Sequence, residues 1–245
     1  MQILESERVT KNFGGLAAVS RVDFNVDQGQ VVGLIGPNGA GKTTLFNLIS
    51  GALVPDSGEI RFKGKKISGV KPHQICHGGV ARTFQAVHIF GTLSARDNVL
   101  LGALFGKSRS VSSADAAQEA MELLDFTGLS AMSATLAKDL TLANQKRLEV
   151  ARALATQPEL LLLDELMAGL NPTEVAQAME MVTQIRDKGI TILMIEHVMK
   201  AIMNVCDRII VLHHGEKIAE GTPQEIATSK TVVEVYLGES AYAAG

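Results

Sequence analysis

Nine consecutive residues, Gly36-Pro37-Asn38-Gly39-Ala40-Gly41-Lys42-Thr43-Thr44, constrain this chain more than any other stretch. An apolar run at 31–35 precedes them and a helix-like run at 45–49 follows, the strand–loop–helix context that a G-x-x-x-x-G-K-T phosphate loop requires. Glycines let backbone N–H groups surround phosphate oxygens at a helix N-terminus. Lys42 then adds a positive charge for the β- and γ-phosphates, and the Thr43 hydroxyl is placed to ligate Mg²⁺. The pattern predicts binding of a nucleoside triphosphate, against the alternative of a glycine-rich turn that binds nothing.

The bulk composition narrows the class of protein. The net charge is −3 at pH 7, which argues against a nucleic-acid partner. Two cysteines, Cys76 and Cys206, are too few for a disulfide framework, and we expect reduced thiols in a cytosolic protein. The acidic N-terminus does not resemble a signal peptide, and no apolar run reaches membrane-spanning length. If a membrane is involved, we expect another chain to span it.

Alternating apolar runs and amphipathic stretches predict an α/β fold. Residues 1–35 indicate short strands separated by turns, with 22–26 alternating as a half-buried strand does. Buried strands are expected at 160–165 and 191–195, helices at 114–124, 145–155 and 174–186, and closing strands at 208–212 and 216–219. One face of the helix expected at 114–124 carries the apolar residues Ala117, Ala120, Met121 and Leu124. We expect a mostly parallel sheet, interrupted from about residue 94 by a helical insert.

Two carboxylates, Asp164 and Glu165, end the apolar strand expected at 160–165, where ionised groups are costly unless they serve a function. Asp164 is placed to orient the groups that bind Mg²⁺, and Glu165 to act as the general base for an attacking water. His197, after the strand at 191–195, is a candidate for hydrogen bonding to the γ-phosphate, although a lone His at a strand end is more often structural. His73, Cys76 and His77 lack the ligand spacing of a metal site, and a short polar helix is the better interpretation.

The order of these elements resembles the nucleotide-binding subunit of an ABC transporter over nearly the whole chain. Residues 36–44 match the Walker A motif, 160–165 the Walker B motif with its catalytic Glu165, Gln85 the Q-loop glutamine and His197 the switch histidine. Phe13 matches the aromatic residue that stacks on adenine, although a lone Phe taken by itself is more often part of the core. Residues 168–172 match the D-loop, which includes Gly169, Leu170 and Asn171.

Four stretches make the resemblance narrower: Phe13-Gly14-Gly15-Leu16, Arg82-Thr83-Phe84-Gln85, residues 168–172 and Val235-Tyr236-Leu237-Gly238-Glu239. They are similar to the ATPase subunits of branched-chain (hydrophobic) amino acid importers, and less similar to lipopolysaccharide-export ATPases. The resemblance implies ATP and Mg²⁺ as cofactors, hydrolysis aided by Lys42, and Thr43, Gln85 and Asp164 as the residues around the metal.

One motif departs from the family. The signature segment falls on Leu140-Thr141-Leu142-Ala143-Asn144, where the usual sequence is LSGGQ. Thr141 keeps a hydroxyl where LSGGQ has serine, but Leu142 and Ala143 replace the two glycines. Close approach of this backbone to a phosphate group is therefore less permissive. In the family two subunits pair head-to-tail and each signature completes the partner's ATP site. We therefore expect a heterodimer in which a second ATPase subunit supplies an orthodox signature.

The resemblance also implies an organisation and a set of partners. It divides the chain into a RecA-like ATP-binding core with an antiparallel β part (1–85 and 156–225), a helical subdomain (86–155) and a tail (226–245). The expected partners are two transmembrane permease subunits, which dock near residues 85–99, and indirectly a solute-binding protein; the location is the cytoplasmic face of the membrane. Val87, Ile89, Phe90 and Leu93 would suit that docking groove or, equally, ordinary core packing.

Three alternatives stay open. A GTPase or small-molecule kinase would share the phosphate loop, but the chain has no Asn-Lys-x-Asp motif for guanine. A soluble ABC ATPase of DNA repair or translation would bring coiled coils, two cassettes or a basic surface. A catalytically silent regulatory subunit is motivated by residues 140–144, and the presence of Lys42, Asp164 and Glu165 argues against it.

Overall fold

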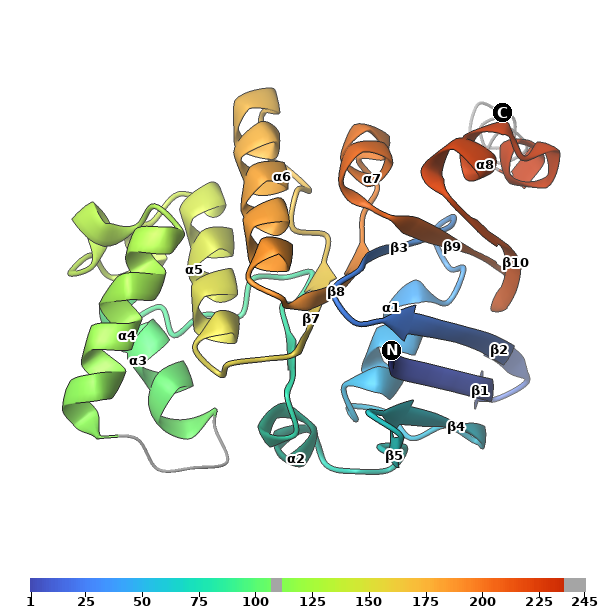
Figure 1. Cartoon of the computed structure of the whole chain (residues 1–245), viewed down its shortest axis with the longest axis horizontal. Helices are drawn as coiled ribbons and strands as arrows, with labels where there is room; N and C mark the ends of the chain where they lie inside the picture. Colours follow the sequence, from blue (N-terminus) through green and yellow to red (C-terminus); the bar gives the residue numbers. More distant parts are fainter. Residues whose placement is uncertain (107–111, 236–245) are drawn as a thin grey trace. The chain divides into compact units, whose positions relative to one another are not determined.

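The structure, a computed structural model (Figure 1), describes residues 1–106 and 112–235. Its chain divides into two compact units. The first unit combines Met1–Lys71 with Thr191–Gly245, and the second is Pro72–Ile190. Strand and helix types agree with the predicted α/β class. The stretch 235–239, which contributes to the family resemblance, falls largely outside the described residues.

The first unit carries two sheets. Its elements are β1 (Gln2–Phe13), β2 (Leu16–Asp27), β3 (Val31–Ile35), α1 (Lys42–Ile49), β4 (Ser57–Phe62), β5 (Lys65–Lys66), β8 (Thr191–Ile195), α7 (Met199–Val205), β9 (Arg208–His213), β10 (Glu216–Gly221) and α8 (Pro223–Thr228). One sheet is antiparallel, in the order β2-β1-β4-β5. In the other, β3 runs parallel to both β8 and β9, and β10 pairs antiparallel with β9.

Strand β3 lies between β8 and β9 in the second sheet, and every residue in it is buried. A strand covered on both faces reads as a continuous apolar run, which is why 31–35 and 191–195 were predictable as parallel strands. Both predictions are confirmed, as are the closing strands β9 and β10. The phosphate loop follows β3 directly and therefore lies at the carboxyl end of a parallel strand, where α/β folds bind ligands.

The expectation of short strands near the N-terminus is wrong for β1 and β2, which are 12 residues each and form the long paired ribbon in Figure 1. Their pairing is interrupted by register shifts, for example between Ser6 and Val9. Arg8 and Arg21 adopt positive φ at these irregularities. A bulge breaks the alternation of apolar and polar residues, so one long strand looks like two short ones in the sequence.

The second unit contains α2 (Pro72–His77), β6 (Val80–Arg82), α3 (Ala95–Phe105), α4 (Ser113–Phe126), α5 (Leu142–Leu154), β7 (Leu160–Asp164) and α6 (Pro172–Asp187). Strands β6 and β7 are parallel, with Arg82 opposite Leu162. The predicted helices at 145–155 and 174–186 and the short polar helix at His73–His77 are confirmed. The predicted strand at 160–165 is also confirmed, except that it ends at Asp164 and leaves Glu165 just beyond it.

Helices α3, α4 and α5 enclose a hydrophobic cluster of their own, which runs from Ala95 to Ala155 (Figure 1). Leu148 and Ala151 of α5 are fully buried in it. In α4 the buried face is Ala116, Ala120 and Leu124, and the expectation that Met121 faces inward is wrong. Alanines at i and i+4 let the helices approach closely, and the longer Met121 side chain is left partly in solvent.

Candidate functional site

The phosphate loop has a shape that only glycine permits at two positions. Gly36 and Gly41 have φ of 150° and 101°, respectively. A Cβ on Gly36 would lie 2.1 Å from the Leu212 carbonyl oxygen, and one on Gly41 would lie 2.3 Å from the Ala18 carbonyl oxygen. Any side chain there would collide with a neighbouring backbone and strain its own.

Neighbouring segments of the first unit brace this loop. The Gly215 N–H donates to the Ala40 carbonyl at 3.1 Å, and the Ser20 N–H donates to the Gly215 carbonyl at 2.8 Å. The turn between β9 and β10 therefore joins the phosphate loop to β2.

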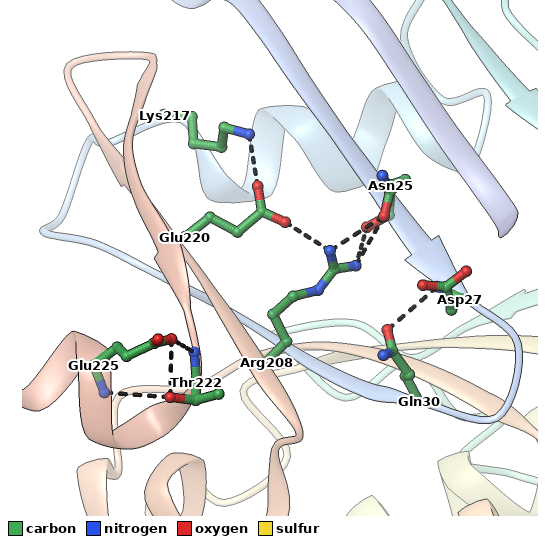
Figure 2. A network of polar contacts seen from close by, with 8 residues as sticks. All are labelled: Asn25, Asp27, Gln30, Arg208, Lys217, Glu220, Thr222 and Glu225. Carbon is green, nitrogen blue, oxygen red and sulfur yellow. Dashed lines mark hydrogen bonds and ion pairs between the residues drawn. The ribbon is translucent and has the colours of Figure 1, made fainter.

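Figure 2 shows how the same three strands are joined further along. Arg208 of β9 donates to the Asn25 side chain of β2 at 3.1 Å and to Glu220 of β10 at 2.8 Å. Lys217 completes the cluster with a 2.6 Å bond to Glu220. These links hold β2 and the β9–β10 hairpin together as the frame around the phosphate loop.

Lys42 and Thr43 begin α1. The Lys42 ammonium is buried and donates to the carbonyls of Gly36 and Pro37 at 2.6 and 2.8 Å, so it organises its own loop. Gly41 is the N-cap and supplies no side-chain bond to the helix. Gly41 therefore has no side chain to bond the backbone N–H groups of this first turn, and a helix start of this kind suits the binding of an anion. Thr43 is exposed beside them.

Phe13 and His197 belong to the same unit. Phe13 ends β1 with 50% of its surface exposed, so the interpretation as a core residue is wrong. It pairs with Leu16 across the hairpin, and the carbonyl of Ala18, further along β2, is the group that a Cβ on Gly41 would meet. His197 follows β8 and is exposed.

The second unit holds the two carboxylates. Asp164 ends β7 and accepts a hydrogen bond from the Arg82 guanidinium at 2.8 Å, while its own N–H donates to the Thr83 hydroxyl at 3.1 Å. The Arg82 and Asp164 side chains are only 7% and 1% exposed. In so buried a pair, removal of one partner strands a charge, at a cost of about 3–5 kcal/mol. Sequence reasoning gave Arg82 no role, although a basic residue at the end of a buried strand is itself a signal.

Glu165 lies in a tight turn after β7, with φ of 52°. The Lys146 ammonium of α5 donates to the carbonyls of Glu165 and Ala168 at 2.7 and 2.8 Å and so fixes the turn. The Gln85 side-chain amide donates to the Glu165 carboxylate at 3.2 Å, so the predicted Q-loop glutamine and the predicted base are in contact. Lys146 was also missed, and its only sequence signal is a lysine on the buried face of a helix.

The residues around Gln85 are held against α5. The Arg82 guanidinium lies 5.0 Å from the Phe84 ring centroid, and Phe84 stacks on His88 at 4.6 Å. The His88 N–H donates to the Glu149 carboxylate of α5 at 3.0 Å. Burial raises the pKa of Glu149, and this hydrogen bond acts in the opposite direction. A continuous set of contacts therefore leads from Asp164 through Arg82 and this loop to α5.

The signature segment forms the start of α5. Thr141 is the N-cap, and its hydroxyl accepts from the Asn144 N–H at 3.4 Å. Leu140 and Ala143 are buried, whereas Leu142 is 47% exposed. A Cβ on Gly169 would lie 3.2 Å from Leu142, so this segment and the predicted D-loop adjoin.

In the D-loop, Leu170 precedes Asn171, which is the N-cap of α6. The Asn171 side chain accepts from the N–H groups of Thr173 and Glu174 at 3.0 Å each, and the Glu174 carboxylate accepts from the Asn171 N–H at 2.9 Å. This capping box gives Asn171 a structural role in the described chain.

The residues predicted to surround Mg²⁺ have suitable chemistry. Thr43, Gln85 and Asp164 offer hydroxyl, amide and carboxylate oxygens, which are the donors that Mg²⁺ prefers. Among residues 1–106 and 112–235, no group of three or more His, Cys, Asp or Glu side chains is arranged to hold a metal.

Comparisons with known proteins agree with these features. Residues 19–168 match the family model described as ABC transporter, and residues 216–242 match the model described as Branched-chain amino acid ATP-binding cassette transporter. The chain is 39% identical to the high-affinity branched-chain amino acid transport ATP-binding protein BraF of Pseudomonas aeruginosa, across 97% of this chain and 98% of that protein. It is 38% identical to the corresponding LivG protein of Escherichia coli over the same shares.

Solved structures give the same result. The ADP conformation of MJ1267, an ATP-binding cassette of an ABC transporter, superposes with a TM-score of 0.88 at 33% identity, covering 97% of this chain and 99% of that one. MJ0796, a bacterial ABC transporter cassette solved as a dimer, gives a TM-score of 0.83 at 25% identity, covering 90% and 99%. The chain therefore belongs to the ABC transporter family, as one of its ATP-binding cassettes.

Proposed function

We propose that this chain is the ATP-hydrolysing subunit of an importer for branched-chain or other hydrophobic amino acids. The observation that carries the proposal is the end-to-end similarity to BraF and LivG, whose names state branched-chain amino acid transport. The match of residues 216–242 to the branched-chain model supports the same substrate class.

ATP binding is assigned to the first unit. Phe13 stacks on the adenine, and the loop Gly36–Thr44 receives the triphosphate. The exposed ring of Phe13 and the uncapped start of α1 support these roles. Lys42 offsets charge on the β- and γ-phosphates.

Hydrolysis is assigned to Glu165, which aligns and deprotonates the attacking water, with His197 hydrogen bonding to the γ-phosphate. The contact between Gln85 and Glu165 supports a role for Gln85 in reporting the γ-phosphate to the helical part of the chain. Thr43, Gln85 and Asp164 would hold Mg²⁺, which neutralises charge on the β- and γ-oxygens when bound. Arg82 keeps the Asp164 carboxylate oriented.

The working unit is a heterodimer with a second ABC ATPase subunit. MJ0796, a relative, forms a dimer. Residues 140–144 would face the partner's ATP together with the D-loop at 169–171. The absence of both signature glycines supports an asymmetric pair, in which the partner's orthodox signature serves the site of Lys42.

Two transmembrane permeases would carry the solute, with a solute-binding protein outside, and this chain would lie on the cytoplasmic face of the membrane. Within the described part of the chain, every helix is too short or too polar to cross a bilayer. The docking groove would lie near residues 85–99, where Phe90 is exposed while Ile89 packs against the α3–α5 cluster. The independent cluster from Ala95 to Ala155 supports a helical subdomain at 86–155, set into a core formed by 1–85 and 156–225, with a tail at 226–245.

A silent regulatory subunit is the second candidate, and the observation that favours it is the capped, glycine-free start of α5. The two functions are distinguished by the ATPase activity of the chain alone and of the chain mixed with the partner subunit. We expect activity with the partner, and a fall of about 100-fold or more in Glu165→Gln. Glu180→Gln, on the exposed face of α6, is the matched control and keeps full activity.

Silence in every mixture would favour the regulatory role. Activity of the chain alone, abolished by Glu165→Gln, would mean that residues 140–144 form a working signature and would overturn the need for a heterodimer. For the substrate class, the assembled complex in vesicles should take up leucine and leave a charged amino acid outside; the opposite preference would overturn it.

A further inference from the structure

The strand that carries Phe13 loses its neighbour before it reaches that residue. Strand β4 begins at Ser57, and Ser57 pairs with Thr10 of β1. Beyond Thr10, β1 continues to Phe13 without a β4 partner on that side. Unpaired edges of this kind are mobile unless another group satisfies their N–H and C=O groups.

Asp56, immediately before β4, takes the place of the missing strand. Its carboxylate accepts from the Lys11 ammonium at 2.8 Å and from the Asn12 N–H at 2.7 Å, and the Asn12 side chain adds a 3.2 Å bond. The Asp56 N–H donates to the Thr10 carbonyl at 2.8 Å. One residue therefore binds the three residues that precede Phe13.

The charge of Asp56 is suited to this position. The hydrogen bonds from Lys11 and Asn12 lower the pKa of the Asp56 carboxyl, so it is ionised at neutral pH. Lys11, held by that carboxylate, lies with its ammonium 5.9 Å from the Phe13 ring centroid. The ring is thus flanked by a fixed cation while half of its surface faces solvent.

Asp56 also belongs to the segment that follows α1. The Leu53 N–H donates to the Asn47 carbonyl at 2.9 Å, which ties this segment to the end of the helix. Helix α1 starts at the phosphate loop. The phosphate loop and the arm that carries Phe13 are thereby anchored to the same helix.

We propose that Asp56 is a positioning residue for nucleotide-base recognition, which fixes Lys11–Phe13 so that the Phe13 ring is pre-ordered for the adenine. The inference rests on the proposed stacking role of Phe13 and adds a residue that does not itself touch the nucleotide. Ordering an arm before binding removes part of the entropy cost of association, typically worth a few-fold to about tenfold in affinity for one immobilised side chain.

The test compares a nucleotide with a ligand that has phosphates but no base. Asp56→Ala should raise the Kd for ATP by about five- to tenfold. It should leave unchanged the inhibition constant with which inorganic tripolyphosphate competes against ATP binding. Asp23→Ala is the matched control, because the Asp23 carboxylate also accepts a β1 backbone N–H, that of Arg8 at 2.7 Å, at a position outside the segment that carries Phe13. It should change neither constant.

Phe13→Ala separates the two ideas. It should weaken ATP binding, and adding Asp56→Ala to it should cause no further loss, because both changes remove the same interaction. If Phe13→Ala leaves the Kd for ATP unchanged, the stacking role itself is wrong. If Phe13→Ala weakens binding but Asp56→Ala does not, or if Asp56→Ala weakens ATP and tripolyphosphate equally, the positioning role is overturned while stacking stands.

Discussion

Helices α1 and α5 both begin at segments for which we propose a phosphate-binding role, but they begin in opposite ways. Helix α1 starts after Gly41, which has left-handed φ and no side chain to cap the helix. Helix α5 starts after Thr141, whose hydroxyl already accepts the Asn144 N–H, and the exposed Leu142 follows. A helix start that must bind an anion needs its N–H groups uncommitted, whereas one that stabilises only its own fold is better served by a cap.

The two starts also differ in what holds them. Gly36 and Gly41 are confined by the backbones of Leu212 and Ala18, and Lys42 binds two carbonyls of its own loop. The start of α5 is held by side chains, namely the buried Leu140 and Ala143. We therefore expect substitutions in the first segment to be severe and substitutions in the second to be mild, and the following predictions test that contrast.

The largest effect is expected from Gly41→Ala. The new Cβ would lie 2.3 Å from the Ala18 carbonyl oxygen, in a backbone conformation that alanine disfavours. ATP affinity should fall roughly 100-fold, equivalent to about 3 kcal/mol, in an equilibrium binding titration. Gly39→Ala is the control, since Gly39 also has positive φ but nothing lies within 4 Å of its added Cβ. Equal losses in both would show that strain alone, without collision, explains the effect.

The next effect is a gain. Replacing Leu142 and Ala143 with glycine would give α5 the permissive backbone that α1 has. We expect the ATPase rate of the chain alone to rise by about tenfold, or ~1.4 kcal/mol in the barrier. Leu136→Gly, which removes another exposed leucine from the same unit, should leave the rate unchanged. A rate unaffected by the double change would place the limitation outside the signature.

Thr141→Ala should act on stability instead of binding. Loss of the N-cap costs about 1 kcal/mol, which lowers the thermal midpoint by roughly 2–4 °C in a chain of this size. Thr141→Gly should cost only a few tenths of a kcal/mol because glycine is itself acceptable at this position. ADP affinity at the chain's own phosphate loop should be unchanged by either substitution, and a drop would contradict the separation of the two helix starts.

The smallest effect is expected at α4, which begins without any predicted phosphate role. The Ser112 hydroxyl accepts the Asp115 N–H at 3.1 Å and donates to its carboxylate at 2.7 Å. Ser112→Ala should destabilise by about 0.5 kcal/mol and leave ATPase activity intact. An altered ATPase rate would mean that cap loss in general, and not the signature position, explains any effect seen at Thr141.

The elements that could be predicted from the sequence are those whose structure depends on the pattern of adjacent residues. A few adjacent residues identify the buried strands β3, β7 and β8, because each is a short continuous apolar run. The phosphate loop is identified in the same way, by the glycines and Lys42 that directly follow β3. The irregular ladder of β1 was hidden because bulges at Arg8 and Arg21 disturb its alternation.

Three side chains escaped sequence reasoning because their roles depend on distant partners. Lys146 binds carbonyls of the Glu165 turn, Arg82 binds Asp164, and Asp56 binds Lys11. Their sequence neighbourhoods do not reveal these partners, since the contacts form only when separate elements pack. Each is a charged residue that completes the geometry of a predicted site residue nearby.

The confinement of Gly36 and Gly41 has a consequence for how such chains diverge. Both glycines are required by the carbonyls of Leu212 and Ala18, whether or not a nucleotide ever enters the loop. A gene copy that drifted away from catalysis would still have to keep them to retain its fold. The glycine spacing therefore indicates the architecture of the loop and does not by itself indicate that a chain hydrolyses ATP.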